Sequence, residues 1–436
     1  MTSFQFKDDF MLGVASAATQ IEGGERNHSW FDWACQGKIK DGTSPLRATD
    51  HINRWPEDFM LMQQMGIQTY RFGVEWSRIE PECGRFDEKA LRLYRAMLLR
   101  LHELNIHPLL TLHHFTNPLW FEKMGAFEHP DSLSIYLRFV ETVIRFLGDL
   151  VSDYITINEP NVYAVFGYLY GLWPPGEKSF GKTVRVLSRL AECHIRAYSL
   201  IHQIQSEMGR SGTQVGFAHH MRVFSPLNSR NPWHRLNAHL LEVLFQNLLA
   251  DAMLTGRFSF PLVKPKHLSE GKYYDFLGVN YYTRSTVKGP ADGVRPNVPV
   301  NDLGWEIWPF GLIHCARALW ERYPAPIYIT ENGTCDIDDS FRARFLYEHL
   351  MQIAQSDLPI KRYYHWCFCD NFEWLEGERA RFGLVHVDFE TQRRTIKCSG
   401  RFYADLIAKG GCDEALYEKY AADQVYPLKG RLLEKE

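Results

Sequence analysis

The sequence predicts one α/β domain over residues 1–436, built as a single closed (β/α)8 TIM barrel with long loops at the carboxyl ends of the strands. Three observations predict this fold. Eight short apolar runs recur along the chain, helical segments lie between them, and no low-complexity linker or change of composition divides the chain. Strands that are apolar on both faces and alternate with helices are typical of a parallel sheet covered by helices.

The eight runs are rich in β-forming residues and end in polar or aromatic ones. They are FMLGVASAATQIEG at 10–23, QTYRFGVEW at 68–76, IHPLLTLHHF at 106–115, DYITINEP at 153–160, QVGFAHH at 214–220, DFLGVNYY at 275–282, PIYITENG at 326–333 and YYHWCFCDNFEW at 363–374. Helical spacing is found at 55–66, 87–105, 132–151, 234–253 and 339–355, and long loops are expected at 20–55, 160–180 and 284–308. An open doubly wound sheet is not favoured, because the chain lacks G-x-G-x-x-G after its first strand and lacks G-x-x-x-x-G-K-[ST] altogether.

Composition excludes several classes of function. The chain is 45% hydrophobic and 23% charged with a formal net charge of −3, and its basic residues are scattered, so we expect no nucleic-acid partner and no membrane binding. The start, MTSFQFKDDF, lacks the apolar core of a signal peptide. Nine cysteines occur without CxxC pairs or zinc-ligand spacing, which predicts buried, reduced thiols, a cytoplasmic location and no metal. Because both nucleotide-binding motifs are missing, we also expect no cofactor. Cys367 and Cys369 should lie on one side of the last strand, unpaired. The oligomeric state is left open.

Two of the runs end in a carboxylate. TINEP at 156–160 and ITENG at 329–333 each place a Glu where an apolar strand stops, although burying an ionised group is costly. A parallel barrel brings all strand ends to one rim, so Glu159 and Glu331 are expected to meet there. Two carboxylates in one cleft push their pKa values apart, leaving one protonated acid and one charged nucleophile or base, as glycoside hydrolysis requires. A single strand-end Glu is more often a structural ion-pair partner; the pair favours catalysis.

Polar and aromatic residues accompany this pair at the predicted strand ends. Sugar hydroxyls both donate and accept hydrogen bonds, so a sugar pocket needs amide, imidazole and carboxylate groups, and the apolar faces of sugars suit flat indole rings. The polar candidates are Gln20, His114, Asn158, Asn280 and Glu373. The tryptophans expected near the rim are Trp120, Trp305, Trp366 and Trp374, whereas Trp30, Trp33 and Trp76 are expected in the core.

Six ordered motifs resemble glycoside hydrolase family 1. They are ATQIEG at 18–23, YRFGVEWSRIEP at 70–81, TINEP, GVNYY at 278–282, ITENG and CDNFEW at 369–374, and the similarity runs from about Phe10 to Phe389. The resemblance implies a (β/α)8 barrel and retaining hydrolysis of β-linked glycosides. Its substrates would be small β-glycosides or short β-linked oligosaccharides, most of all β-glucosides, with β-galactosides or β-fucosides as side substrates.

The same resemblance assigns roles to the residues. Glu159 would be the acid/base, and Glu331 the nucleophile that forms a glycosyl-enzyme intermediate. Tyr282 would donate a hydrogen bond to the nucleophile, and Arg71 beside it would favour its ionised form. Asn158 would bind the sugar 2-hydroxyl. The remaining sugar contacts would come from Gln20, His114, Glu373 and Trp374, with Trp366 beneath the sugar ring and Asn280 and Phe382 as supporting residues.

Variants within the family can be separated by their residues. Members that act on phosphorylated sugars carry a Ser, a Lys and a Tyr after the eighth strand, where this chain has Glu373, Ala380 and Phe382. A 6-phosphate would therefore lack a partner and would be repelled by the carboxylate at 373. Two alternatives remain: an enzyme that transfers the sugar to alcohols, which product analysis with an added acceptor would reveal, and a non-catalytic carbohydrate-binding protein on the same barrel. Loss of either Glu would mark the second, and both are present.

Overall fold

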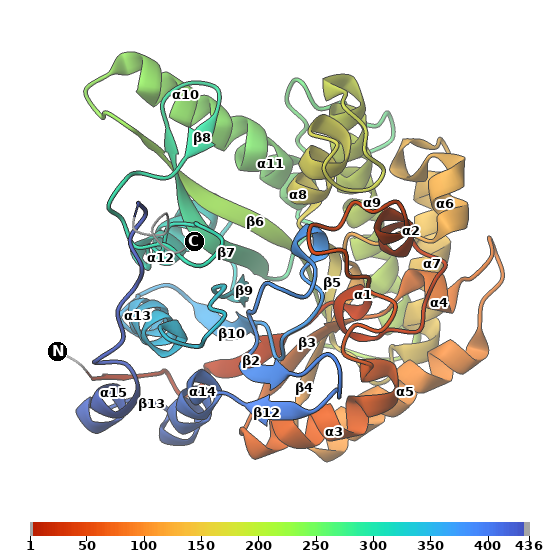
Figure 1. Ribbon diagram of the computed structural model, residues 1–436. Coiled ribbons are helices and arrows are strands. Elements are labelled where there is room, and N and C mark those ends of the chain that lie inside the picture. The colour runs from red at the N-terminus through yellow and green to blue at the C-terminus, as the bar shows by residue number, and fades with distance from the viewer. Residues whose placement is uncertain (1–2, 431–436) are drawn as a thin grey trace.

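The computed structural model describes residues 3–430 and shows a closed barrel of eight parallel strands surrounded by helices (Figure 1). The strands are β2 (Met11–Ala15), β3 (Thr69–Gly73), β4 (His107–His113), β5 (Asp153–Asn158), β6 (Gln214–Pro226), β7 (Leu277–Val287), β9 (Ile327–Asn332) and β10 (Ile360–Trp366). Their order is β6-β5-β4-β3-β2-β10-β9-β7, and pairing of β6 with β7 closes the ring. The predicted fold class is confirmed, and each of the eight runs contributes one barrel strand.

Two of the strands continue beyond the barrel. β6 and β7 still pair from Val223↔Arg284 to Pro226↔Val287, and the short β8 (Asp292–Gly293) folds back antiparallel on the end of β7. We call residues 222–226 and 284–293 the β6–β8 extension. It lies at the carboxyl end of the strands, where Figure 1 shows it rising past the ring toward α10 (Pro232–Glu242).

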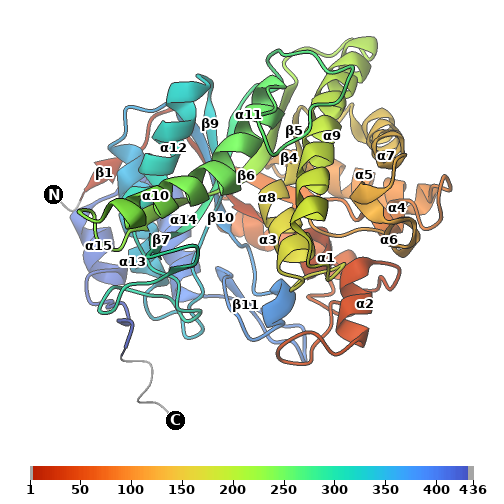
Figure 2. The same cartoon turned by 90° about the horizontal axis from the view of Figure 1, so that it is seen from above.

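The helices cover the outside of the ring, and Figure 2 shows α9, α10 and α11 together on the near side. The principal helices are α3 (His51–Gln64), α5 (Glu88–Glu103), α7 (Ser132–Leu147), α9 (Phe180–Glu207), α10, α11 (Leu248–Thr255), α12 (Phe310–Arg322), α13 (Arg342–Ala354), α14 (Cys398–Lys409) and α15 (Glu414–Tyr420). Helices form at all five predicted segments. At 234–253, however, a π-helical turn, η3 (Val243–Asn247), separates α10 from α11.

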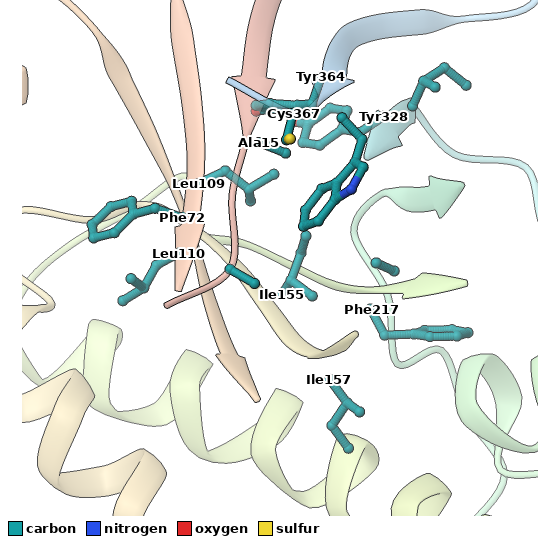
Figure 3. Packing of buried hydrophobic residues seen from close by; sticks show 14 of the residues in the cluster. Ala15, Phe72, Leu109, Leu110, Ile155, Ile157, Phe217, Tyr328, Tyr364 and Cys367 are labelled. Atoms are coloured by element: carbon teal, nitrogen blue, oxygen red, sulfur yellow. The ribbon is translucent and has the colours of Figure 1, made fainter. Parts of the chain in front are cut away.

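Side chains alternate between the barrel interior and the helix layer, as the pleat of a strand requires. In Figure 3, Leu109 and Ile155 point into the barrel, whereas Leu110 and Phe72 point toward the helices. All four side chains are buried. The same alternation places Arg71 inside the ring, level with Leu109 of the neighbouring strand. Polar side chains that project inward near the strand ends therefore adjoin a packed apolar interior.

The last predicted strand run is wrong in its second half. β10 ends at Trp366, and Cys367 and Cys369 lie in the buried segment after it, so they do not share one side of a strand. The Cys367 thiol instead donates to the Cys369 carbonyl at 3.1 Å. All nine cysteines are free; six are buried as predicted, whereas Cys35, Cys83 and Cys398 are exposed.

The predicted loops contain short helices. The segment 20–55 includes the end of α1 (Ala18–Ile21), α2 (Ser29–Cys35) and the start of α3, and the segment 160–180 includes α8 (Pro160–Ala164) and a π-helical turn, η2 (Val165–Leu169). The segment 284–308 opens with the end of β7 and contains β8. Within residues 3–430 no helix has the length and apolarity to cross a bilayer, and no three His, Cys, Asp or Glu side chains are grouped as metal ligands.

His349 should make folding stability depend on pH. It lies fully buried on α13, its Nδ1 is 2.8 Å from the Phe345 carbonyl, and burial lowers its pKa to about 3. The folded pKa lies below the ordinary value of 6.5, so His349 contributes stability above about pH 6.5 that is lost as the pH falls toward 3. His349→Gln should therefore reduce the loss of unfolding free energy between pH 7 and pH 5 by about 2 kcal/mol.

Urea unfolding of both proteins at the two pH values measures this difference. His239→Gln, which replaces an exposed histidine of α10, is the control and should lose as much stability as the wild type. Equal losses in wild type and His349→Gln would contradict the prediction.

Candidate active site

A pocket opens at the carboxyl ends of the barrel strands, and both predicted carboxylates line it. Eight of the twelve predicted site residues form its wall: His114, Glu159, Tyr282, Glu331, Trp366, Glu373, Trp374 and Phe382. The other four lie just beneath, each hydrogen-bonded to a residue of the site: Gln20, Arg71, Asn158 and Asn280. The structure thus brings the whole predicted set together.

Glu331 lies near the end of β9 and is held by two donors. Arg71 Nη1 donates to its Oε1 at 2.6 Å, and the Tyr282 hydroxyl donates to its Oε2 at 2.6 Å. Burial raises the pKa of Glu331 to about 7; Arg71 and the Tyr282 hydrogen bond oppose the rise, and the charge of Glu159 adds to it. Both oxygens are therefore fixed in position, with one carboxylate face left toward the pocket.

Arg71 joins three strands beneath the pocket. Besides Glu331, its guanidinium donates to the Thr330 carbonyl at 2.9 Å, to Asn158 Oδ1 at 2.6 Å and to Thr111 Oγ1 at 3.2 Å. The side chain is fully buried, so its charge depends on these partners. A single cation thereby sets the positions of Glu331 on β9 and Asn158 on β5.

Glu159 follows β5 directly and occupies the N-cap position of α8, without a capping hydrogen bond from its side chain. Its backbone is left-handed, with φ 42° and ψ 58°, an uncommon conformation for a residue with a side chain, and Pro160 at the first helical position fixes the turn. Its Oε1 accepts from Asn280 Nδ2 at 2.8 Å and lies 3.0 Å from His220 Nδ1. Among residues 3–430 no side chain or backbone group bonds its Oε2, which leaves that oxygen available to a ligand.

The surroundings of Glu159 act on its pKa in opposite directions. Burial raises the pKa of Glu159, but a protonated His220 and the hydrogen bonds from His220 and Asn280 outweigh it and lower the pKa below its ordinary value. A neutral His220 lacks the charge that does most to lower this pKa, and so favours the arrangement predicted from the sequence, a protonated Glu159 beside an ionised Glu331.

The far side of the pocket carries the polar residues predicted to bind sugar hydroxyls. Gln20 Nε2 donates to the Phe372 carbonyl at 2.8 Å and to Glu373 Oε2 at 3.1 Å. Burial raises the pKa of Glu373 to about 8, against the hydrogen bonds from Trp366 and Gln20, so this carboxyl can donate a hydrogen bond at neutral pH. Within the described chain, Gln20 Oε1 is buried without a hydrogen-bond partner. A hydroxyl-rich ligand would supply one.

His114 extends this polar wall toward Asn158, the residue before Glu159. Its Nε2 is 2.9 Å from Asn158 Nδ2, and burial, aided by the charges of Arg71 and His113, holds its pKa well below the ordinary value. The imidazole is therefore neutral, accepts at Nε2 and carries its proton on Nδ1. In the part of the chain that the structure describes, Nδ1 has no partner.

Indole rings form the rest of the wall. Trp366 and Trp374 both stack against His114, with ring centroids 5.7 and 5.6 Å from it, and Trp305 lines the pocket as predicted. The prediction for Trp120 is wrong: it lies on α6 (Leu119–Met124), packs against Trp76 and donates to the Glu80 carbonyl, outside the pocket. Its short helix turns the ring back onto the core.

Sequence reasoning missed several lining residues. His220 ends the fifth run, QVGFAHH, so the strand-end rule that selected the other candidates would also have found it. Arg222 lies two residues further along, in the β6–β8 extension. The predicted run ends at His220, so the strand-end rule does not select it. The remaining missed residues are mostly apolar: Phe115, Val162, Phe166, Trp173, Leu303, Leu375 and Glu376.

Comparison with known proteins identifies the family of the chain. The family model described as Glycosyl hydrolase family 1 matches residues 2–412. The chain belongs to glycosyl hydrolase family 1. It is 31% identical to a 1,4-beta-D-glucan glucohydrolase of Thermotoga neapolitana over 93% of this chain and 99% of that protein, and 30% identical to Beta-glucosidase A of Thermotoga maritima over 94% and 99%.

Solved structures of family 1 resemble the whole chain. A beta-glycosidase from Pyrococcus horikoshii superposes with a TM-score of 0.88 at 32% identity, covering 97% of this chain and all of that one. The Thermotoga maritima beta-glucosidase in complex with deoxynojirimycin gives 0.86 at 29% identity, covering 94% and 100%. Family 1 glycosidases retain the anomeric configuration, so this family 1 member is a retaining glycoside hydrolase.

Tyr282→Phe should raise the pKa of Glu331 further. The lost hydroxyl donates to Oε2 at 2.6 Å, and a donor of this kind favours the ionised carboxyl. A hydrogen bond to a charged group contributes roughly 1.5–3 kcal/mol, so the pKa should rise by at least about 1. Carboxyl 13C NMR of glutamate-labelled protein measures it, with the resonance assigned by Glu331→Gln. Tyr281→Phe is the matched control, because Tyr281 bonds the Trp308 carbonyl; an unmoved titration in Tyr282→Phe would refute the expectation.

Proposed function

We propose that this family 1 member is a β-glucosidase that works by double displacement, with Glu331 as nucleophile and Glu159 as acid/base. One observation supports the assignment most directly. Two buried carboxylates line one pocket, Glu331 with both oxygens held by donors and Glu159 with Oε2 free. The curated relatives that carry the name β-glucosidase are similar over nearly the whole chain.

In the first step a carboxylate oxygen of Glu331 attacks the anomeric carbon. The bond from that carbon to the glycosidic oxygen breaks, and the proton on Glu159 Oε2 passes to the departing oxygen. Arg71 and Tyr282 orient the nucleophile and stabilise it until the new bond forms. The product of this step is a glycosyl ester on Glu331 and a free alcohol.

In the second step water reverses the chemistry. Glu159, now ionised, takes a proton from water as the water oxygen attacks the anomeric carbon, and Glu331 departs as a carboxylate. Two displacements at one carbon restore the β configuration. Asn158, which Arg71 and Asn280 hold by hydrogen bonds of 2.6 and 3.1 Å, would bind the 2-hydroxyl as charge develops on the sugar.

The outer hydroxyls of the sugar would bind the polar wall opposite. Gln20 offers its free Oε1, Glu373 its carboxyl and His114 its Nδ1–H, with Trp366 beneath the ring. Glu373 and Phe382 line the pocket, and neither side chain carries a positive charge to pair with a phosphate, which supports an unphosphorylated substrate. A panel of aryl β-glycosides that differ only in the sugar tests the preference, and a higher kcat/KM for the galactoside or fucoside than for the glucoside would overturn the β-glucosidase assignment.

A cytoplasmic location remains part of this proposal, supported by nine free thiols.

Glu331→Gln should lose nearly all turnover of an aryl β-glucoside. An amide cannot form the glycosyl ester, and losses of this kind cost about 4 kcal/mol or more, roughly a thousandfold in kcat. Steady-state kinetics measure the loss. Glu207→Gln, an exposed Glu on α9, is the matched control and should keep the wild-type rate. Retention of more than about a tenth of the rate in Glu331→Gln, equivalent to less than about 1.4 kcal/mol, would remove Glu331 from its role.

Glu159→Ala should be rescued by azide. Without the acid/base, breakdown of the glycosyl ester is slow, and azide needs no proton removed before it attacks. The rate on an activated aryl β-glucoside should rise with azide, and the product should be the β-glycosyl azide, identified by its anomeric coupling constant in NMR. Formation of the α-azide would contradict attack on an ester formed at Glu331.

A further inference from the structure

His220 lies between the acid/base and an arginine. Its Nδ1 is 3.0 Å from Glu159 Oε1, and its Nε2 is 3.2 Å from Arg222 Nη2. A guanidinium has donors only, so Arg222 donates and Nε2 accepts. An accepting nitrogen carries no proton, and the one remaining proton of the ring is therefore on Nδ1, where it is donated to Glu159. The contacts thus define a neutral His220.

The β6–β8 extension holds Arg222 in this position. Its Nη1 is 3.3 Å from Asp292 Oδ2 and 3.3 Å from Ser285 Oγ, and the Ser285 hydroxyl donates to the same Asp292 oxygen at 2.5 Å. The guanidinium also lies over the Phe245 ring, 5.4 Å from its centroid. Asp292 is in β8, which pairs with the end of β7 at Val287↔Asp292. A hairpin outside the barrel thereby anchors the arginine beside the site.

We propose that Arg222, anchored by Asp292, is a positioning residue that keeps His220 neutral and so lets Glu159 retain the proton it gives to the leaving group. The proposal rests on the acid/base role of Glu159 given above. It gives a functional role to Arg222 and to the β7–β8 hairpin, which lie outside the closed ring of strands.

Electrostatics supports this role. A second proton on His220 would place an imidazolium 3.0 Å from the buried Glu159 carboxyl, where the attraction of opposite charges is only weakly screened. Glu159 would then lose its proton at a lower pH, because a charged His220 lowers its pKa. A guanidinium already bonded to Nε2 both occupies the site of that proton and repels its charge.

The other groups around the ring do not replace Arg222. The Tyr282 ring stacks on His220 with centroids 6.1 Å apart, and its hydroxyl is committed to Glu331. His219, on the opposite side of β6, bonds the Gln246 carbonyl, and burial lowers its pKa to about 4, so it is neutral. From η3 the apolar Phe245 packs edge-on against His220. Arg71 and Glu331 also lie near Glu159. They bond each other and carry opposite charges when both are ionised, so their effects on Glu159 oppose one another.

Arg222→Met tests the proposal through the pH profile of kcat/KM. Two substrates are compared: phenyl β-glucoside, whose departure needs acid, and 2,4-dinitrophenyl β-glucoside, whose leaving group departs without a proton. For the phenyl substrate the basic limb should move to lower pH by one unit or more, because His220 gains a proton and Glu159 loses its own earlier. For the dinitrophenyl substrate kcat at pH 7 should stay within about threefold of the wild type. Arg222 is 23% exposed, and Arg222→Leu provides a second apolar replacement with the same expected shift.

The double variant Arg222→Met with His220→Asn tests whether Arg222 acts on Glu159 through His220. Asparagine has no ring nitrogen to protonate, so the basic limb should return to within about 0.3 pH units of that of His220→Asn alone. Arg295→Met is the matched control: this arginine lies near the extension, donates to the Pro226 carbonyl and should leave the limb unmoved.

Each outcome separates this proposal from the proposed function. A limb that stays in place or moves to higher pH in active Arg222→Met would overturn the role of Arg222, as would a double variant that keeps the full shift. Failure of the wild type to hydrolyse either glucoside, or full activity of Glu331→Gln, would instead overturn the proposed function. Activity on the dinitrophenyl substrate shows that a variant is folded.

Discussion

The buried ion pair between Arg71 and Glu331 is the interaction on which the site depends. Arg71 has no exposed surface, yet it bonds a carboxylate, an amide and a backbone carbonyl on strands that lie on different sides of the ring. Such a cation is stable only while all its partners are in place, because a single missing partner leaves a charge unpaired in the interior. The network therefore fixes the relative positions of β3, β5 and β9 at the end of the barrel where the pocket opens.

The barrel supplies what this network needs. Leu109, level with Arg71 in the neighbouring strand, and Ile155 both point into the barrel and are buried, so the ion pair lies in a packed interior. Parallel pairing delivers every strand end to the same rim, so residues distant in the sequence reach one another without any special loop. Glu159, the proposed acid/base, is placed differently: its own backbone is left-handed at the start of α8, and its carboxyl is held by Asn280 and His220.

The eight strands and the residues at their ends could be predicted because both follow a regular period. Apolar β-runs ending in polar side chains identify Glu159, Glu331 and their neighbours without any tertiary information. The pattern predicts burial but does not always predict the secondary structure of a buried segment. Residues 367–372 are buried, but they form a loop after Trp366 and not the end of a strand. The helical spacing at 234–253 is interrupted by a π-helical turn. Arg222 was beyond reach because its position depends on the pairing of β6, β7 and β8 past the barrel, which no local spacing encodes.

The unpaired Gln20 Oε1 and His114 Nδ1 have a consequence for the empty protein. Buried polar atoms without partners cost free energy, and within the described chain both lie in or beside the pocket. A hydroxylated ligand that bonds both atoms exchanges hydrogen bonds with water for fixed ones, so these atoms favour guests with correctly placed hydroxyls. A saturating ligand that binds only the native state also raises the melting temperature.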